Sequence, residues 1–352
     1  SPLCAGNTLS LTASTIAGAT YVWAGPNSFT SAVQNPTIPG ATTLAAGVYS
    51  VSAIVAGCPG PIGTVSVTVN PSPAAPTAGS NSPLCAGSTI NLTASAIAGA
   101  TYNWTGPNAF TSTLQNPTIV GASTLAAGVY SVRATVAGCQ GPAGTTTVVV
   151  NPTPVAPTAG GTATLCAGGT INLTASAIAG ATYNWTGPNS FTSNVQNPTI
   201  PGASTLATGM YSVTATVAGC TGPAGTFSVT VFGIPGAPTL GSNSPLCTGN
   251  TLSLTANTIV GASYSWTGPN SFSSTLQNPT IAAATTAASG TYSVSVNVSG
   301  CGSAASTIAV VVNPTPAAPT AGSNSPLCAG QTINLTASNI AGATYSWTGP
   351  NS

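Results

Sequence analysis

The strongest constraint on this chain is its internal repetition. The block Tyr-x-Trp-x-Gly-Pro-Asn occurs five times without any insertion or deletion between the copies, starting at Tyr21, Tyr102, Tyr183, Tyr264 and Tyr345. Self-similarity at one fixed period is typical of tandem arrays, in which each repeat is one structural unit. We therefore predict four complete units and part of a fifth: repeat 1 (1–72), repeat 2 (73–153), repeat 3 (154–234), repeat 4 (235–315) and partial repeat 5 (316–352).

Each repeat carries the pattern of short β-strands. In repeat 1, Leu9 and Leu11 alternate with polar residues, Tyr21 and Trp23 share one face of the next strand, and residues 49–55 and 65–69 alternate in the same way. A period of two indicates half-buried strands. Gly-Pro-Asn, Gln-Asn-Pro and Ala-Ala-Gly separate these strands as turns, and no stretch has a sustained helical period. The sequence therefore predicts an all-β sandwich in every repeat.

Proline-rich linkers separate the repeats. The linker Asn-Pro-Ser-Pro-Ala-Ala-Pro begins at Asn70 and has copies that begin at Asn151, Phe232 and Asn313. Proline fixes the backbone angle φ, so we expect these linkers to be short and stiff. An extended array with one recurring rotation between neighbours follows, with roughly 35–45 Å of length per repeat.

The cysteines predict a disulfide in each repeat. The chain has nine cysteines, no Cys-x-x-Cys pair and no histidine that could complete a zinc site. Disulfides also imply an oxidising compartment outside the cytoplasm. We expect each bond to lie near one end of its sandwich, with no bond between repeats, and Cys328 to have its partner outside the chain. The predicted pairs share one constant spacing and are Cys4 with Cys58, Cys85 with Cys139, Cys166 with Cys220, and Cys247 with Cys301.

The composition excludes most chemistry. Arg133 is the only Lys or Arg, and the chain has no Asp, Glu or His. General acid–base catalysis and nucleophile activation both need such groups, so we expect no enzyme and no catalytic residue. Hard cations need carboxylates, and nucleic acids need clustered basic residues, so we expect no metal, cofactor or nucleic-acid partner. No apolar run is long enough to cross a bilayer, so we expect no membrane insertion.

The motifs of the repeat resemble those of a known group of proteins. Cys-Ala-Gly-x-Thr-Ile-x-Leu-Thr-Ala, Tyr-x-Trp-x-Gly-Pro-Asn-x-Phe, Gln-Asn-Pro-Thr-Ile, Gly-x-Tyr-Ser-Val and Gly-Cys resemble the bacterial immunoglobulin-like or PKD-like repeats of giant surface proteins. Such repeats are typical of adhesins in gliding Gram-negative bacteria. The resemblance covers the whole chain and implies a tandem array of immunoglobulin-like β-sandwich domains on the bacterial cell surface. The missing initiator Met and the end within a repeat predict a piece of a longer protein.

The aromatic residues are candidates for the core. By the same resemblance, Tyr49 is the corner tyrosine between strands E and F, and Leu11 and Val51 replace the usual central disulfide beside Trp23. Two alternatives stay open: Tyr21 and Trp23 could form a platform for sugars, and Phe29, in a loop, could contact a neighbouring repeat. Arg133 is interpreted as a solvated surface residue. The predicted core aromatics are Trp23, Trp104, Trp185, Trp266, Tyr49, Tyr130, Tyr211 and Tyr292.

The sequence favours a structural role. The leading hypothesis is an extracellular fibre or adhesin stalk whose copies associate side by side or end to end, because almost no charge keeps the chains apart. The alternative is a module in which exposed aromatics of each repeat bind glycan or another surface. A third hypothesis, ice binding, rests on the charge-free, threonine-rich composition, but an 81-residue period offers no short lattice-like repeat.

Overall fold

The chain is a series of small β-sandwiches. The computed structural model describes residues 2–350, and within them the only helical elements are four single-turn 3-10 helices. Every sheet takes its strands from one sequence repeat. The boundary between the chain's two compact units runs through repeat 3, which contributes strands to both. The predicted all-β class is confirmed.

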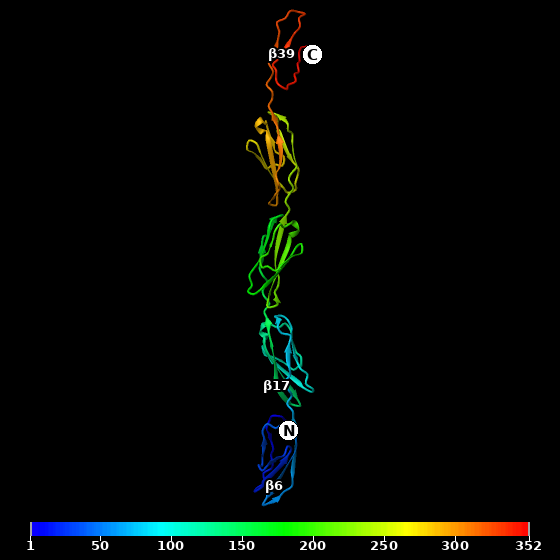
Figure 1. Cartoon of the computed structure of the whole chain (residues 1–352), viewed down its shortest axis with the longest axis vertical. Coiled ribbons are helices and arrows are strands. Elements are labelled where there is room, and N and C mark those ends of the chain that lie inside the picture. The colour runs from blue at the N-terminus through cyan, green and yellow to red at the C-terminus, as the bar shows by residue number, and fades with distance from the viewer. Residues whose placement is uncertain (1, 351–352) are drawn as a thin grey trace. The chain divides into compact units, whose positions relative to one another are not determined.

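Repeat 2 has the full set of strands. Figure 1 labels its longest strand, β17, and the equivalent of β16 in repeat 1, β6. The elements of repeat 2 are β10 (Ala78–Ser80), β11 (Leu84–Cys85), β12 (Ile90–Ala94), β13 (Thr101–Gly106), β14 (Phe110–Ser112), β15 (Thr118–Ile119), η2 (Thr124–Ala126), β16 (Gly128–Val136), β17 (Cys139–Val148) and β18 (Val150–Asn151).

These strands form two facing sheets. One sheet has the antiparallel order β10-β12-β15, and the other has the antiparallel order β14-β13-β16-β17. The short strand β11 pairs in parallel with β18, which places Cys85 opposite Asn151 at the far end of the strand that begins at Cys139. The first sheet corresponds to strands A, B and E of an immunoglobulin domain, and the second to strands C′, C, F and G.

The alternation of the sequence decides which side chains enter the core. In β13, Tyr102 and Trp104 are buried whereas Asn103 between them is exposed, and in β12 Ile90 and Leu92 are buried on either side of exposed Asn91. Successive side chains of a strand point to opposite faces, so one face of each strand supplies the core. The predicted strand faces are confirmed at these positions.

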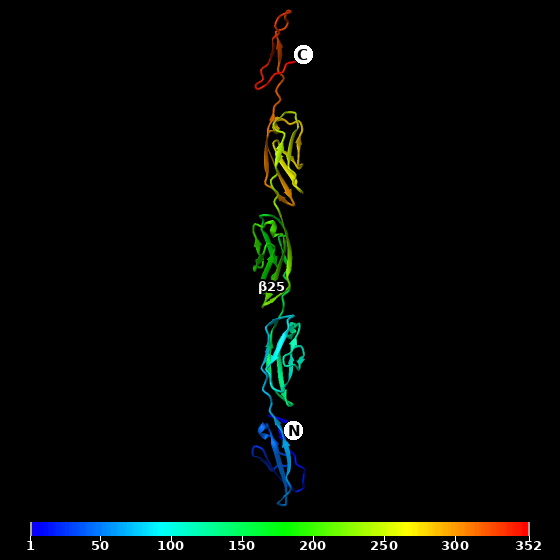
Figure 2. The ribbon, with the colours of Figure 1, turned by 90° about the vertical axis from the view of Figure 1, so that its right-hand side faces the viewer.

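Repeats 3 and 4 repeat this order of elements with small differences in the last strands, and repeat 1 does so from the counterpart of β11 onward; Figure 2 labels β25, the strand of repeat 3 that is equivalent to β16. In repeat 1 they are β1 (Leu3–Cys4), β2 (Leu9–Ser10), β3 (Thr20–Gly25), β4 (Phe29–Ser31), β5 (Thr37–Ile38), η1 (Thr43–Ala45), β6 (Gly47–Val55), β7 (Cys58–Pro59), β8 (Gly63–Val67) and β9 (Val69–Asn70). In repeat 3 they are β19 (Ala159–Gly161), β20 (Thr164–Cys166), β21 (Ile171–Ala175), β22 (Thr182–Gly187), β23 (Phe191–Ser193), β24 (Thr199–Ile200), η3 (Thr205–Ala207), β25 (Gly209–Val217), β26 (Cys220–Thr221) and β27 (Gly225–Phe232). In repeat 4 and partial repeat 5 they are β28 (Leu240–Ser242), β29 (Leu246–Cys247), β30 (Leu252–Ala256), β31 (Ser263–Gly268), β32 (Phe272–Ser274), β33 (Thr280–Ile281), η4 (Thr286–Ala288), β34 (Gly290–Val298), β35 (Cys301–Gly302), β36 (Ser306–Val310), β37 (Val312–Asn313), β38 (Ala321–Ser323) and β39 (Leu335–Ala337).

Candidate functional site

The disulfides join neighbouring repeats. Cys4 of repeat 1 is bonded to Cys139 of repeat 2, Cys85 of repeat 2 to Cys220 of repeat 3, and Cys166 of repeat 3 to Cys301 of repeat 4, each with a sequence separation of 135. Cys58, Cys247 and Cys328 are free and exposed. The predicted pairs Cys4–Cys58, Cys85–Cys139, Cys166–Cys220 and Cys247–Cys301 are therefore wrong, and so is the expectation that no bond joins two repeats.

Strand length explains this correction. Cys85 lies beside Asn151, where the last strand of repeat 2 ends, whereas Cys139 lies where that strand begins. The nearly continuous strand from Cys139 to Asn151 spans roughly 40 Å at the usual rise. A disulfide needs Cα atoms within about 7 Å of each other, so the two cysteines of one repeat cannot reach each other. The observed bonds have Cα–Cα distances of 5.4–5.6 Å.

A hydrogen bond accompanies the disulfide at the joint between repeats 1 and 2. The side-chain Nδ2 of Asn70, the last residue of β9, donates to the carbonyl oxygen of Ala137, 3.2 Å away, in the turn just before Cys139. Asn151 makes the same bond to Ala218 of repeat 3, also at 3.2 Å. In repeat 3 the equivalent position is Phe232, which has no amide to donate. The asparagine before the linker prolines thus has a structural role that the sequence pattern did not reveal.

Two glycines let the linker that enters repeat 2 pack closely against that repeat. A Cβ atom on Gly141 would collide with the carbonyl oxygen of Pro73, and one on Gly144 would collide with that of Pro76. Only glycine lets the linker backbone lie this close to β17. In repeat 3, Gly222 faces the carbonyl of Pro154 in the same manner. The linker is therefore packed along the edge of the repeat that follows it.

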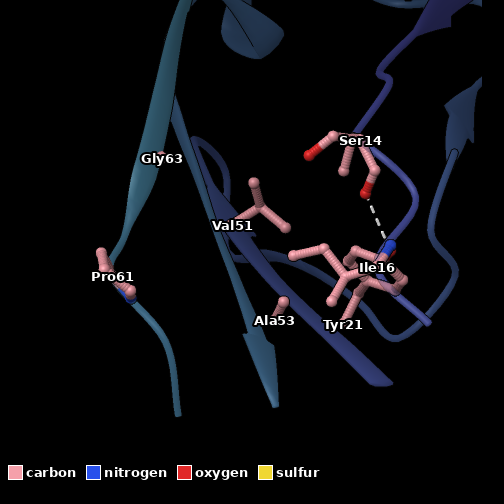
Figure 3. A pocket seen from close by; sticks show the side chains of 8 residues that line it. Ser14, Ile16, Tyr21, Val51, Ala53, Pro61 and Gly63 are labelled. Carbon is pink, nitrogen blue, oxygen red and sulfur yellow. Dashed lines mark hydrogen bonds between the residues drawn. The ribbon is translucent and has the colours of Figure 1, made fainter. Parts of the chain in front are cut away.

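A pocket of repeat 1 lies on the equivalent surface. Figure 3 shows it with Tyr21 and Ile16 on one side, Val51 and Ala53 on the floor, and Gly63 on the other side. Gly63 is the counterpart of Gly144, so this position is the one that the entering linker covers in repeat 2. The pocket measures about 170 Å³ and has no charged lining residue. The pocket therefore corresponds to the surface that binds the linker backbone in repeat 2.

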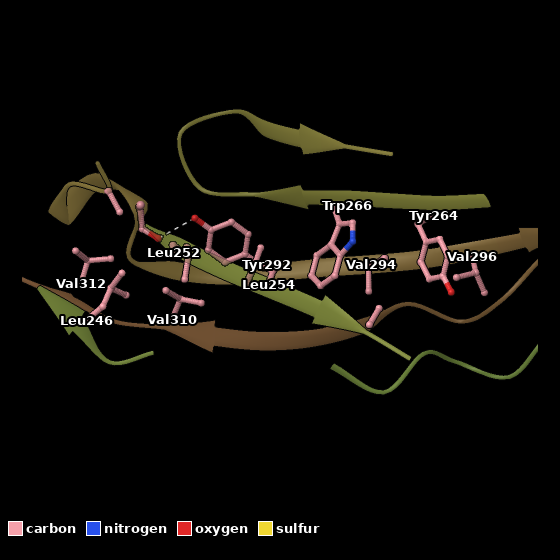
Figure 4. Packing of buried hydrophobic residues seen from close by; sticks show 13 residues of the cluster. Leu246, Leu252, Leu254, Tyr264, Trp266, Tyr292, Val294, Val296, Val310 and Val312 are labelled. Carbon is pink, nitrogen blue, oxygen red and sulfur yellow. Dashed lines mark hydrogen bonds between the residues drawn. The ribbon is translucent and has the colours of Figure 1, made fainter. Parts of the chain in front are cut away.

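Buried tryptophans and tyrosines fill the core of the complete repeats. Trp23, Trp104, Trp185 and Trp266 are at most 1% exposed, and each indole Nε1 donates to the backbone carbonyl of the glutamine in the Gln-Asn-Pro turn. Tyr49, Tyr130, Tyr211 and Tyr292 are fully buried. Figure 4 shows Trp266 and Tyr292 side by side in the core of repeat 4, with the Tyr292 hydroxyl bonded to a backbone carbonyl.

The buried tyrosine is the corner tyrosine of each sandwich. The hydroxyl of Tyr130 donates to the carbonyl oxygen of Ala126, at the end of the preceding 3-10 helix, at 2.9 Å. A Cβ atom on Gly106 would collide with the Tyr130 ring, which explains the glycine of the Trp-x-Gly-Pro motif. Phe110 packs edge-on against Tyr130 with ring centroids 5.5 Å apart. Its counterpart Phe29 lies in β4 and packs against Tyr49 in the same way, so the interpretation of Phe29 as a loop residue is wrong.

The corner tyrosines predict a one-sided dependence of stability on pH. Desolvation by burial raises the pKa of Tyr49, Tyr130, Tyr211 and Tyr292. The folded state favours the neutral phenol. The stabilisation that this gives the folded state is therefore complete below the ordinary tyrosine pKa of about 10 and is lost as the pH rises above that value. With no Asp, Glu or His in the chain, we expect a constant melting temperature from pH 4 to pH 9 and a steep fall beyond pH 10. Calorimetry after alkylation of the three free thiols measures this, and a change of several degrees between pH 4 and pH 8 would contradict it.

The described residues offer little reactive chemistry. Arg133 is exposed, and its Nη1 donates to the carbonyl oxygen of Gly141 at 3.0 Å. Within residues 2–350, no three His, Cys, Asp or Glu side chains lie where they could hold a metal ion. In the same residues, no helix is long and apolar enough to cross a membrane. The joints between repeats are therefore the most distinctive sites of the chain.

The fold assignment follows from three features of the complete repeats. The strand order A-B-E on one sheet (B-E in repeat 1) and C′-C-F-G on the other is that of an immunoglobulin domain, and a buried tryptophan on strand C and a corner tyrosine near the start of strand F accompany it. The repeats are immunoglobulin-like domains. The chain is a tandem array of them, with the constant period that its sequence shows.

Comparison with solved structures gives distant neighbours that are arrays of immunoglobulin domains or extracellular domains. No protein-family model and no curated protein sequence matches the chain. Sidekick-1 immunoglobulin domains 1–5 are 15% identical to this chain. The match covers 91% of this chain and 78% of the Sidekick-1 chain, with a TM-score of 0.31. The extracellular domains 3–5 of Drosophila OTK are 12% identical over 65% of this chain and 93% of that chain, with a TM-score of 0.32. The N-terminal four immunoglobulin domains of Dscam1 isoform 8.4 are 12% identical over 89% and 96%, with a TM-score of 0.24. Likeness at this level carries no argument about function.

Proposed function

We propose that the chain is the repeat region of an extracellular fibre or adhesin stalk, and that its copies associate side by side or end to end. The observation that carries the stalk role is the joint: disulfides tie repeats 1 to 2, 2 to 3 and 3 to 4, and the linkers that enter repeats 2 and 3 pack closely against the repeat that follows. Three disulfides also support a place outside the cytoplasm. The resemblance of the motifs to adhesin repeats extends this proposal to the surface of a gliding Gram-negative bacterium.

Recurring exposed aliphatic side chains support self-association. Leu44, Leu125 and Leu206 occupy the same position in the 3-10 helices of repeats 1–3 and are 67–72% exposed. Val48, Val129 and Met210 follow them at the start of strand F and are 57–62% exposed. A surface that offers apolar groups at a constant spacing and has almost no charge opposes contact between chains only weakly.

The glycan-binding alternative lacks the feature it needs. It requires an exposed cluster of aromatics at the same place in every repeat, but each aromatic residue of described repeats 1–4 is buried or half-buried. Trp23 and Tyr21, the residues considered for a sugar platform, are 1% and 6% exposed, and the Tyr21 hydroxyl bonds the backbone at Ser14 and Ile16. The stalk is therefore the better-supported proposal.

Self-association is tested by sedimentation and electron microscopy of the full chain at low and high salt. We expect elongated particles that bundle, and bundling should persist at about 1 M salt because it does not depend on ion pairs. Replacing Leu44, Leu125 and Leu206 by Ser should reduce the associated fraction at least tenfold, since each buried leucine contributes about 2 kcal/mol.

The matched control changes the neighbouring residue of each helix. Thr43, Thr124 and Thr205 are exposed, and their replacement by Ser should leave the associated fraction unchanged. Dispersed single chains at every ionic strength would overturn self-association and leave the stalk. Compact particles of the four repeats would overturn the stalk.

A further inference from the structure

The positions of the cysteines divide the chain into two kinds of segment. From one cysteine to the next along the sequence, a long segment alternates with a short one: 4–58, 58–85, 85–139, 139–166 and so on. A long segment, such as 85–139, holds Trp104, Tyr130 and most of the other buried core residues. A short segment, such as 139–166, holds the last strand of one repeat, the proline linker and the first strands of the next repeat. The disulfides connect the short segments to one another.

We propose that the disulfides and the short segments form two interleaved covalent rails that prevent the stalk from lengthening when its domains unfold. The first rail runs through the Cys4–Cys139 bond, residues 139–166 and the Cys166–Cys301 bond. The second rail runs through residues 58–85, the Cys85–Cys220 bond and residues 220–247. Each disulfide plus short segment advances a rail by two repeats, and the long core segments connect the rails.

The rails hold little slack because their backbone is already extended. Most of residues 139–166 lies in the strands β17, β18, β19 and β20. Pro152, Pro154 and Pro157 hold much of the remaining linker in an extended conformation. Most of the core of a repeat lies in the long segment, outside this path. When it unfolds, its long segment cannot lengthen the chain while the disulfides stay closed.

The inference deepens the proposed stalk function, because a stalk carries tension between its ends. If the disulfides closed within repeats, unfolding would let the segments outside each closed loop extend and so lengthen the chain. Without disulfides, unfolding would let the whole repeat extend. The observed pairing allows neither increase in length. A domain that opens under load can then refold without the two ends of the stalk having moved apart.

The test is to pull single full-length chains by their ends in concentrated guanidinium chloride, where only covalent connections limit the length. Cys58, Cys247 and Cys328 are replaced by Ser to prevent exchange of disulfide partners. With the rails intact, about 80 residues join the ends, so we expect a limiting length of about 290 Å at 3.3–3.6 Å per residue. Full reduction should raise it roughly fourfold, to about 1,200 Å. Bonds within repeats would instead give about 490 Å.

Two double variants separate the rails. Cys85→Ser with Cys220→Ser opens only the second rail, so the limiting length should stay at about 290 Å. Cys166→Ser with Cys301→Ser opens the first rail. The shortest remaining covalent path between the chain ends then runs backward through the long segment 85–139, which gives a limiting length of about 660 Å. Equal lengths for the two variants, or an oxidised chain longer than about 400 Å, would overturn the rails. Neither result bears on self-association, which sedimentation measures separately.

Discussion

Cleavage of the Cys166→Ser variant at Met210 should leave the two halves of the chain joined by a disulfide. Met210 is the only methionine, so cyanogen bromide produces residues 1–210 and 211–352. The Cys85–Cys220 bond spans the cut and does not involve Cys166. If the bonds closed within repeats, Cys166–Cys220 would be the only bridge across the cut, and the variant would fall apart. The readout on a non-reducing gel is one band or two.

The conditions and controls of this cleavage are favourable. The reaction runs in strong acid, where thiolates are absent and disulfide exchange stops. The free thiols are alkylated beforehand. The Cys85→Ser/Cys166→Ser double variant removes both bonds that span Met210, so it should separate completely and report the efficiency of cleavage. Separation of the Cys166→Ser single variant would contradict the inter-repeat pairing.

Replacing Trp104 by Ala should destabilise repeat 2 by about 3–5 kcal/mol, because it removes a fully buried ring and leaves a cavity. Hydrogen exchange followed by mass spectrometry resolves this effect repeat by repeat, which a melting curve of several domains does not. Amides of β13 and β16 should exchange at least a hundredfold faster in the variant, since each step of about 1.4 kcal/mol corresponds to about a factor of ten.

The neighbouring residue of the same strand supplies the control. Asn103 is exposed on the opposite face of β13, and Asn103→Ala should change exchange less than threefold. Tyr130→Phe keeps the ring but removes the hydroxyl bond to Ala126, so an intermediate loss of about 1 kcal/mol is expected. Unchanged exchange in the Trp104 variant would show that the indole is not the centre of the core.

The fold of the repeats could be predicted from the sequence because its signals are local. Alternation around Tyr102 and Trp104 needs only two neighbouring positions to define a buried face, and the structure confirms it. The strand order follows from the same pattern, given the resemblance to immunoglobulin domains. The sequence pattern misplaces Phe29 because the turn before it is so short that β4 follows at once and its ring reaches Tyr49.

The disulfide pairing could not be predicted from spacing, because a periodic sequence defines distances only up to a multiple of its period. The step from Cys4 to Cys58 and the step from Cys4 to Cys139 differ by one whole repeat, so each cysteine has equivalent candidate partners in every repeat. The length of strand from Cys139 to Asn151 decides between them. That strand length, together with the parallel pairing of Cys85 beside Asn151, is the signal that spacing alone lacks.

A bond between Cys4 and Cys139 also has a consequence for biosynthesis. Cys4 must wait as a thiol until the first domain and much of the second have been made and the turn before Cys139 has formed. Cys58 emerges earlier, yet folding of the first domain carries it away to the opposite end of the last strand. Oxidation therefore proceeds one domain behind synthesis, and native folding of each domain comes before the bond that ties it to its successor.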